Sequence, residues 1–161
     1  MDAIEMLEEQ HRDVEDLFDE LESAEASDKQ DLFDELADQL AVHAAIEELH
    51  FYPAVRARRT EDILLESLEE HRTIKRLLAD LLQLDPRNED FAPKVQVLKQ
   101  QVELHVKEEE DELFPKVRKV LDRKQLIALA EDMSVTQENL LDAGDPRQRV
   151  RWQGEEAAPL P

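Results

Sequence analysis

The distribution of glycine constrains this chain more than any other feature. The sequence of 161 residues contains two glycines, Gly144 and Gly154, so the first 143 residues contain none. Phosphate-binding loops, dinucleotide-binding turns and the strained turn of a hydrolase nucleophile all depend on backbone conformations that glycine adopts most readily. These classes of site are therefore excluded over this stretch, and a helical fold is favoured.

Four long segments place apolar residues at alternating spacings of three and four, which is typical of helices that bury one face. The links between them are short, so successive helices are expected to be antiparallel neighbours. The sequence thus predicts an all-α fold, an up-down-up-down four-helix bundle followed by a short C-terminal helix. Pro53 and Pro115 fall inside two of the segments and are expected to bend them. The expected helices span residues 2–23, 28–58, 61–83, 90–120 and 123–141.

The two halves of the predicted bundle are related in sequence. Residues 36–56, LADQLAVHAAIEELHFYPAVR, align without gaps on residues 98–118, LKQQVELHVKEEEDELFPKVR. Residues 8–21 align in the same way on residues 68–81. We therefore interpret the chain as one duplicated helical hairpin, with an approximate two-fold axis between the copies.

The repeat places histidine and glutamate at corresponding positions. In each half, one helix has a single histidine on its apolar stripe, and the next has the pattern His-x-x-x-Glu, whose side chains share one helix face. Imidazole and carboxylate are ligands of iron, manganese or zinc, and two facing glutamates can bridge two ions. Without metal, at least one of the two facing glutamates is expected to take up a proton, as paired carboxylates do. The six candidate metal ligands are His11, His43, Glu47, His71, His105 and Glu109.

Composition limits the other possibilities. The chain has no cysteine, which excludes disulfides, thiolate zinc sites and iron-sulfur clusters, so any metal must be held by histidine and carboxylate. A formal net charge of −21 disfavours nucleic acid and anionic membranes as partners. No secretion signal or membrane-spanning apolar run is found, so a cytoplasmic protein is expected. Nothing in the sequence identifies a protein partner.

Two other interpretations of the histidines and glutamates remain open. A histidine on an apolar stripe is more often a hydrogen-bonded core residue than a ligand, but burying this many charged groups without a cation would cost several kcal/mol per charge. Ferritin-like di-iron carboxylate proteins use the element Glu-x-x-His, which Glu47 and His50 match. The other half has Glu112 where that element needs histidine, so the ferritin-like alternative is the weaker one.

In these residues the chain resembles the hemerythrin-like family, the HHE cation-binding domains. The resemblance covers about residues 1–120 and is carried by the segments EEQHRDVEDLFDEL, HAAIEELHFYP, EEHRTIKRLL and HVKEEEDELFP. It implies a four-helix bundle with a non-heme di-iron centre, bridged by Glu47 and Glu109 and by an oxo or hydroxo group. By the same resemblance, one iron would be bound by His11 and His43, and the other by His71 and His105.

The chain departs from the oxygen-carrying hemerythrins, which use a fifth histidine from a His-x-x-x-His pair on the third helix. The positions four residues before and after His71 hold Ser67 and Lys75, and neither is a convincing iron ligand. The remaining histidine, His50, has Glu112 as its counterpart in the repeat. We expect these two either to orient the bridging carboxylates by a hydrogen bond or to pack, rather than to bind metal.

The resemblance implies a protein that binds or senses oxygen, nitric oxide or peroxide at its di-iron centre, or that handles iron. The alternatives are an enzyme that consumes peroxide or nitric oxide, and a bundle in which metal only stabilises the fold. Residues 1–141 are expected to form the metal-binding domain. Residues 142–161 are expected to form a flexible tail, attached to the acidic body by the arginines at 147, 149 and 151.

Overall fold

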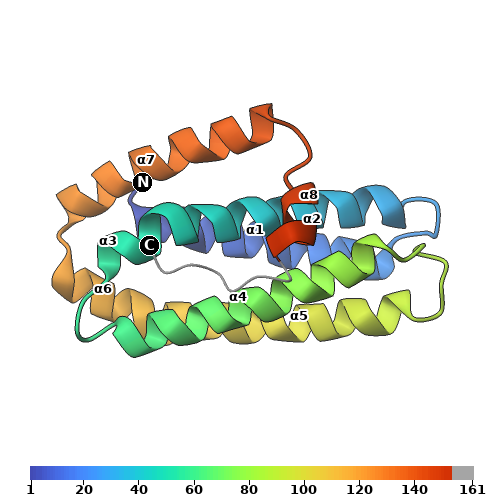
Figure 1. Cartoon of the computed structure of the whole chain (residues 1–161), viewed down its shortest axis with the longest axis horizontal. Coiled ribbons are helices and arrows are strands. Elements are labelled where there is room, and N and C mark those ends of the chain that lie inside the picture. The colour runs from blue at the N-terminus through green and yellow to red at the C-terminus, as the bar shows by residue number, and fades with distance from the viewer. Residues whose placement is uncertain (154–161) are drawn as a thin grey trace.

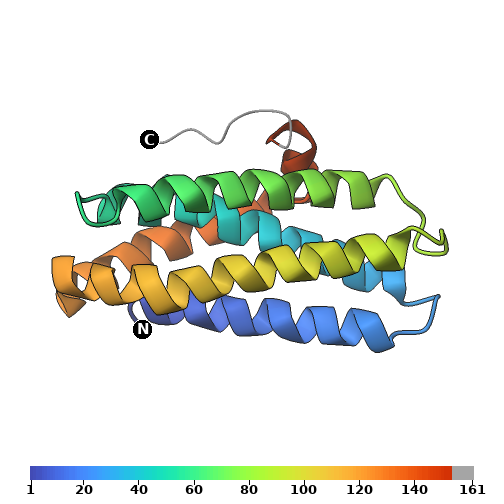
Figure 2. The same cartoon turned by 90° about the horizontal axis from the view of Figure 1, so that it is seen from below.

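The computed structural model describes residues 1–153 as a helical chain (Figure 1). Four long helices, α1, α2, α4 and α5, run alternately up and down, which confirms the predicted four-helix bundle (Figures 1 and 2). Helix α7 packs on α1 and α2, and α8 packs on α4. The helices are α1 (Ala3–Ser23), α2 (Lys29–Ile46), α3 (Tyr52–Val55), α4 (Glu61–Leu82), α5 (Phe91–Glu108), α6 (Phe114–Val120), α7 (Arg123–Asp142) and α8 (Gln148–Gln153), with π-helical turns η1 (Glu47–Phe51) and η2 (Glu109–Leu113).

The two π-helical turns interrupt the helices that carry the His-x-x-x-Glu pattern. After each turn, the backbone amide donates to the carbonyl of the residue five positions back, rather than four. Pro53 and Pro115 then occupy the second position of α3 and α6, where a helix does not need an amide hydrogen. The continuous helices expected over residues 28–58 and 90–120 are therefore each divided into three parts.

The start of the bundle is tied to helices far along the chain by Asp2. This residue caps α1, because its side chain accepts a hydrogen bond from the amide of Glu5, and the Glu5 side chain accepts one from the Asp2 amide. Arg118 and Arg123 each place Nη1 at 3.1 Å from Oδ2 of the fully buried Asp2. The two arginines neutralise a carboxylate that burial would otherwise penalise.

The core consists of two apolar clusters with a layer of histidine and glutamate between them. One cluster contains residues of α3, α6 and α7 at one end of the bundle. The other lies around Phe33 and includes Val150 of α8. Helices α1, α2 and α4 contribute to both clusters, as Leu7 and Val14 of α1 do on the two sides of His11. The polar layer is therefore enclosed from both ends of the bundle.

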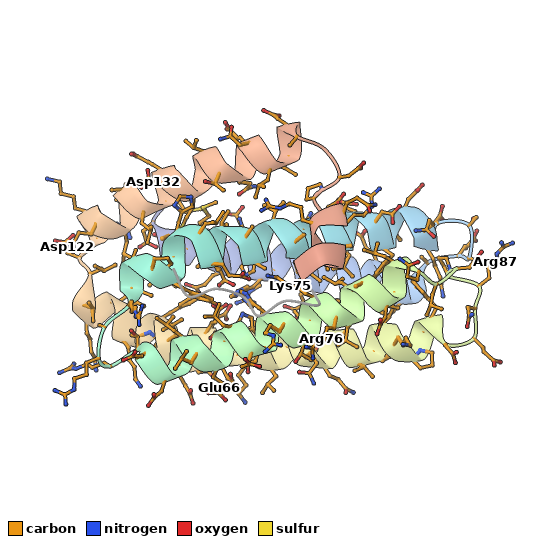
Figure 3. The ribbon with its side chains drawn as sticks, in the orientation of Figure 1. Glu66, Lys75, Arg76, Arg87, Asp122 and Asp132 are labelled. Carbon is orange, nitrogen blue, oxygen red and sulfur yellow. The ribbon has the colours of Figure 1, made fainter. Side chains whose placement is uncertain are left out.

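Charged side chains cover the outer faces of the helices, as Glu66 and Asp132 illustrate in Figure 3. Lys75 differs, because it lies in the interior between α2 and α4 and is only 4% exposed. None of the helices in residues 1–153 is long and apolar enough to cross a membrane.

The segment expected to be a flexible tail contains the short helix α8, which the sequence analysis did not predict. Val150 in this helix is 1% exposed. Arg147 donates to Asp38 from both its backbone amide and its guanidinium, each at 2.9 Å. Arg147 thus attaches the segment to the acidic body as expected, whereas Arg149 is exposed. Residues 154–161 and the Arg151 side chain lie outside the described part of the chain.

Candidate metal centre

The six candidate ligands from the sequence lie together in the middle of the bundle. Helices α1, α2, α4 and α5 each contribute one histidine, and the first residue of each π-helical turn contributes a glutamate. None of the six side chains belongs to a residue more than 7% exposed. The α-helical spacing within α2 and α5 turns histidine and glutamate toward the same layer, as the sequence predicted.

Each glutamate lies close to histidines of both halves of the repeat. Glu47 Oε1 is 3.3 Å from His43 Nε2 in its own half and 3.0 Å from His71 Nε2 in the other. This carboxylate oxygen is therefore within reach of a histidine from each half of the repeat. The corresponding distances from Glu109 Oε1 are 3.4 Å to His105 Nε2 and 3.2 Å to His11 Nε2.

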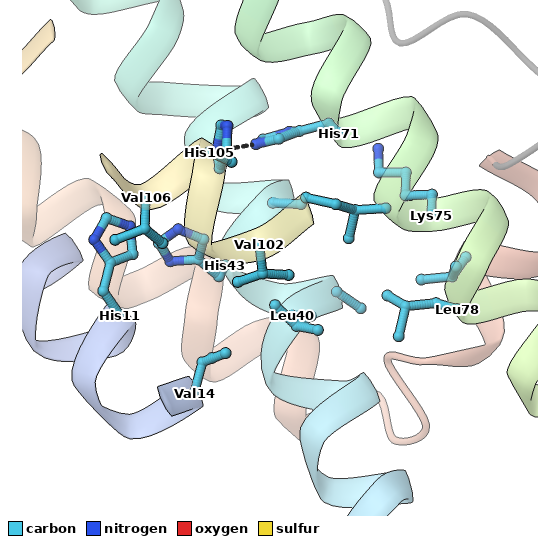
Figure 4. A pocket seen from close by; sticks show the side chains of 14 residues that line it. His11, Val14, Leu40, His43, His71, Lys75, Leu78, Val102, His105 and Val106 are labelled. Carbon is cyan, nitrogen blue, oxygen red and sulfur yellow. Dashed lines mark hydrogen bonds between the residues drawn. The ribbon is translucent and has the colours of Figure 1, made fainter. Parts of the chain in front are cut away.

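The potential ligand atoms fall into two groups, within each of which all atoms lie within 4.8 Å of one another. Glu47 belongs to both groups. The histidine pairs are the same as those that the family resemblance implies, and Figure 4 shows His71 and His105 side by side, with Nε2 atoms 3.1 Å apart. The groups are His11, His43, Glu47 and Glu109, and Glu47, His71 and His105.

The outer ring nitrogen, Nδ1, of each histidine is held by an oxygen of a neighbouring helix. Because these oxygens accept, each Nδ1 carries the proton and each Nε2 faces the centre. Sequence analysis missed the four acceptors, although their repeat-related positions were a usable signal. The Nδ1 contacts are His11 to Glu110 at 2.7 Å, His43 to Gln10 at 2.7 Å, His71 to Glu48 at 2.7 Å and His105 to Glu70 at 2.8 Å.

Two of these acceptors are themselves held by cations. Lys75 Nζ lies 2.9 and 2.8 Å from the two carboxylate oxygens of Glu48. Arg12 Nη2 lies 2.7 and 2.8 Å from those of Glu110, at the surface. Lys75, four residues after His71, therefore supports Glu48 instead of reaching the centre.

Tyr52 brings a hydroxyl group into the centre, which the sequence analysis did not identify. Its hydroxyl donates to Glu109 Oε2 at 2.9 Å and lies 3.3 Å from Glu47 Oε1 and 3.2 Å from His71 Nε2. Burial, together with the charges of the two glutamates, raises the pKa of Tyr52 well above its ordinary value. The hydroxyl is therefore a proton donor in the metal-free protein.

Several histidines of the metal-free centre have raised pKa values. Burial opposes the charged form of each group, but hydrogen bonds to Glu109 and Glu110 raise the pKa of His11 to about 9. The pKa of His105 is also well above its ordinary value, despite burial, because Glu109 and Glu47 lie beside it. Burial would raise the pKa of Glu47, but the neighbouring histidines lower it well below its usual range. Glu47 is therefore not the glutamate of the pair that takes up a proton in the metal-free centre.

Two buried atoms among the candidate ligands lack the hydrogen bonds that a buried polar atom normally makes. His43 Nε2 and Glu47 Oε2 are buried and have no hydrogen-bond partner among the described residues. An unsatisfied polar atom in a protein interior is costly. An imidazole nitrogen and a carboxylate oxygen are both metal ligands, so a bound cation would satisfy both atoms.

The structure does not bring His50 and Glu112 to this centre. The π-helical turn widens the helix after Glu47, so a residue three positions later no longer shares its face. His50 Nε2 instead contacts the Thr136 hydroxyl on α7, and Glu112 is exposed. The hydrogen bond between them that the repeat suggested is replaced by contacts on the outside of the bundle.

Comparison with known proteins finds similar sequences and a similar fold. The sequence model of the hemerythrin HHE cation-binding domain matches residues 2–117. A curated protein of Nostoc sp. named DNA nickase is 32% identical over 116 residues, which are 71% of this chain and 33% of that protein. The chain thus spans about a third of the length of this curated relative.

A solved structure has the same fold. It is the crystal structure of an HHE cation-binding domain-containing protein from Mycobacterium kansasii, with a TM-score of 0.80 at 24% identity, and the match covers 95% of this chain and 99% of that one. The chain belongs to the hemerythrin HHE cation-binding domain family.

Proposed function

We propose that this chain is a non-heme di-iron protein whose centre binds a small ligand, namely oxygen, nitric oxide or peroxide. The observation that carries the proposal is the pair of ligand groups that share Glu47. Two ions fit these groups better than one, because each half of the repeat supplies its own histidine pair and glutamate. Bound iron would supply the open coordination position and the electrons that such ligands need.

The chemistry of the donor set favours iron. All six candidate side chains offer nitrogen or carboxylate oxygen, and there is no cysteine that would favour a thiolate metal. The four Nδ1 contacts fix the ring orientations, so that each Nε2 is held toward the centre before metal arrives. Such preorganisation supports a functional site over a purely structural one.

Turnover of peroxide or nitric oxide is a second candidate, favoured by Tyr52. Its hydroxyl is a buried proton donor at the centre, and a reaction that cleaves a small ligand must transfer protons between the oxygen or nitrogen atoms involved. A ferritin-like centre has less support, because His50 of the Glu-x-x-His element contacts α7 instead of the metal layer.

The name of the Nostoc relative does not lead us to propose DNA cleavage here. The chain covers a third of that protein, and its net charge of −21 would repel a phosphate backbone.

Anaerobic loading with ferrous ion, followed by an iron assay and a visible spectrum, tests the proposal. We expect about two iron per chain, and an oxo-bridged spectrum after exposure to oxygen. A reproducible value of one, or a preference for zinc without an iron spectrum, would overturn it. Stopped-flow mixing of the loaded protein with oxygen, nitric oxide and peroxide separates binding from turnover, because only turnover regenerates the starting spectrum while ligand is consumed.

A further inference from the structure

A small cavity lies beside the four histidines of the candidate metal centre (Figure 4). Its volume is about 30 Å³, and all four buried histidines contribute to its wall. A single water needs roughly 10–15 Å³ measured in this way, so the cavity has room for one molecule of two or three heavy atoms. The rest of the wall is mostly aliphatic, as Leu40, Leu78 and Val102 illustrate. An apolar wall of this kind suits a small uncharged molecule.

One part of this wall does not belong to the four-helix bundle. Among the described residues that line the cavity, Val150 alone comes from outside α1, α2, α4 and α5. Its side chain closes the wall between α2, which contributes Ala41, and α4, which contributes Ile74. Figures 1 and 2 show α8 lying across the outside of the bundle at this place. Without Val150, the cavity would face solvent between these two helices.

The segment that contains α8 packs on α4 and is attached to α2 through Arg147. Arg147 binds Asp38 through two hydrogen bonds of 2.9 Å, and both side chains are partly exposed. The chain enters this segment through Gly144 and Asp145, which have φ values of 79° and 45° and form a tight turn after α7. Among the described side chains of this segment, Pro146 and Val150 are buried, and Arg147 pairs with Asp34 and Asp38 at partly exposed positions. A short segment attached in this way at the rim of the bundle can open locally while the four long helices stay packed.

We propose that α8 is a lid on the ligand cavity, with Val150 as the gate and the Arg147–Asp38 pair as the latch. The nature of the natural ligand rests on the proposed function, but the lid itself does not require iron. Opening the lid admits a ligand and also releases it. A looser latch therefore speeds both steps by the same factor and leaves the dissociation constant unchanged.

The kinetic test uses nitric oxide and the iron-loaded protein in a stopped-flow instrument. Arg147→Ala and Val150→Ala are expected to raise the association and dissociation rate constants together, by about tenfold, because the fraction of open lid increases. Arg149→Ala is the matched control, since Arg149 is an exposed arginine of the same segment and makes the same change of charge. Equal rates in all four proteins would overturn the lid, and so would an equal acceleration by Arg149→Ala.

A second measurement keeps the test independent of metal. Xenon enters dry apolar cavities, so its exchange with the metal-free protein can be followed by xenon NMR. The exchange rate is expected to rise in Arg147→Ala and Val150→Ala and to stay unchanged in Arg149→Ala. Unchanged exchange in all variants would refute the lid even if iron binds as proposed. Faster exchange in a protein that takes up no iron would support the lid and overturn the di-iron function instead.

Discussion

Tyr52 and Phe114 occupy equivalent positions of the repeat, yet only Tyr52 places a hydroxyl group in the polar layer of histidine and glutamate. The Tyr52 hydroxyl lies 2.9 Å from Glu109 Oε2. The Phe114 ring instead stacks on His11, with a centroid distance of 6.1 Å and an interplanar angle of 4°. The two candidate metal positions are therefore chemically different, although the repeat gives them equivalent histidine pairs.

Replacing Tyr52 with phenylalanine removes that hydroxyl and little else. In the metal-free protein, Glu109 loses a hydrogen-bond donor while it remains buried, so Tyr52→Phe should lower the free energy of unfolding by about 1–3 kcal/mol. The loss should shrink in the iron-loaded protein, because metal then satisfies the carboxylate. Denaturant unfolding of both forms measures the difference, and an equal loss with and without iron would contradict this account.

Removing a histidine from either candidate pair should lower the iron content of the centre. His43→Ala and His105→Ala delete a donor that no neighbouring side chain replaces, so iron content should fall from about two per chain to one or none. His50→Ala is the matched control, because His50 contacts Thr136 on α7 and should leave iron content unchanged. The iron assay decides, and equal loss in all three variants would mean that the coordination is wrongly assigned.

The carboxylates behind the histidines should matter for affinity without being ligands. Glu48→Ala removes the acceptor that holds His71 Nδ1 at 2.7 Å and leaves Lys75 buried without its partner. We expect a loss of about 10–100-fold in iron affinity, measured by competition with a chelator. Glu112→Ala removes an exposed carboxylate two positions beyond Glu110, which is the repeat counterpart of Glu48, and should change nothing. Similar losses in the two variants would indicate an effect of net charge alone.

Metal uptake should release protons. In the folded metal-free protein the pKa of His11 is about 9, above its ordinary value of 6.5, because hydrogen bonds to Glu109 and Glu110 outweigh burial. The stability that this protonated histidine contributes is therefore complete below about pH 6.5 and is lost as the pH rises through about 9. Metal must displace the same proton, so affinity should rise across this range. Calorimetry in buffers of different ionisation enthalpy measures the release, and its absence at pH 7 would refute the prediction.

Iron should stabilise the fold without creating it. The two apolar clusters do not depend on metal, so chelated protein should stay helical. Binding to the native state alone adds about 2.7 kcal/mol at a hundredfold excess of ligand over its dissociation constant. Circular dichroism melts should therefore give a higher midpoint for the loaded form. Identical midpoints would mean that the buried layer does not bind metal.

The long helices, their antiparallel order and the six clustered residues could be predicted because each depends on local sequence. Apolar spacing defines a helix face, short links define antiparallel neighbours, and the repeat pairs His11 with His71 and Glu47 with Glu109. These signals do not depend on how one helix is rotated against the next.

The supporting contacts could not be predicted in the same way. Whether Glu48 or His50 faces the centre depends on the π-helical turn, and the sequence showed only that Pro53 must disturb the helix. The Tyr52 hydroxyl reaches Glu109 because of the same turn. Val150 lies in a polar segment without apolar periodicity, so its burial becomes evident only once α8 is placed on α4.

The π-helical turns also determine how this region tolerates changes of length. Each turn contains one residue more than the α-helical hydrogen-bond pattern would need, so loss of one residue within Glu47–Phe51 could leave a continuous helix. Everything beyond the deletion would rotate by about 100° relative to the bridging glutamate. In an alignment of related chains, a single-residue gap at this place would therefore mark a protein that keeps every histidine but has moved the tyrosine hydroxyl away from its centre.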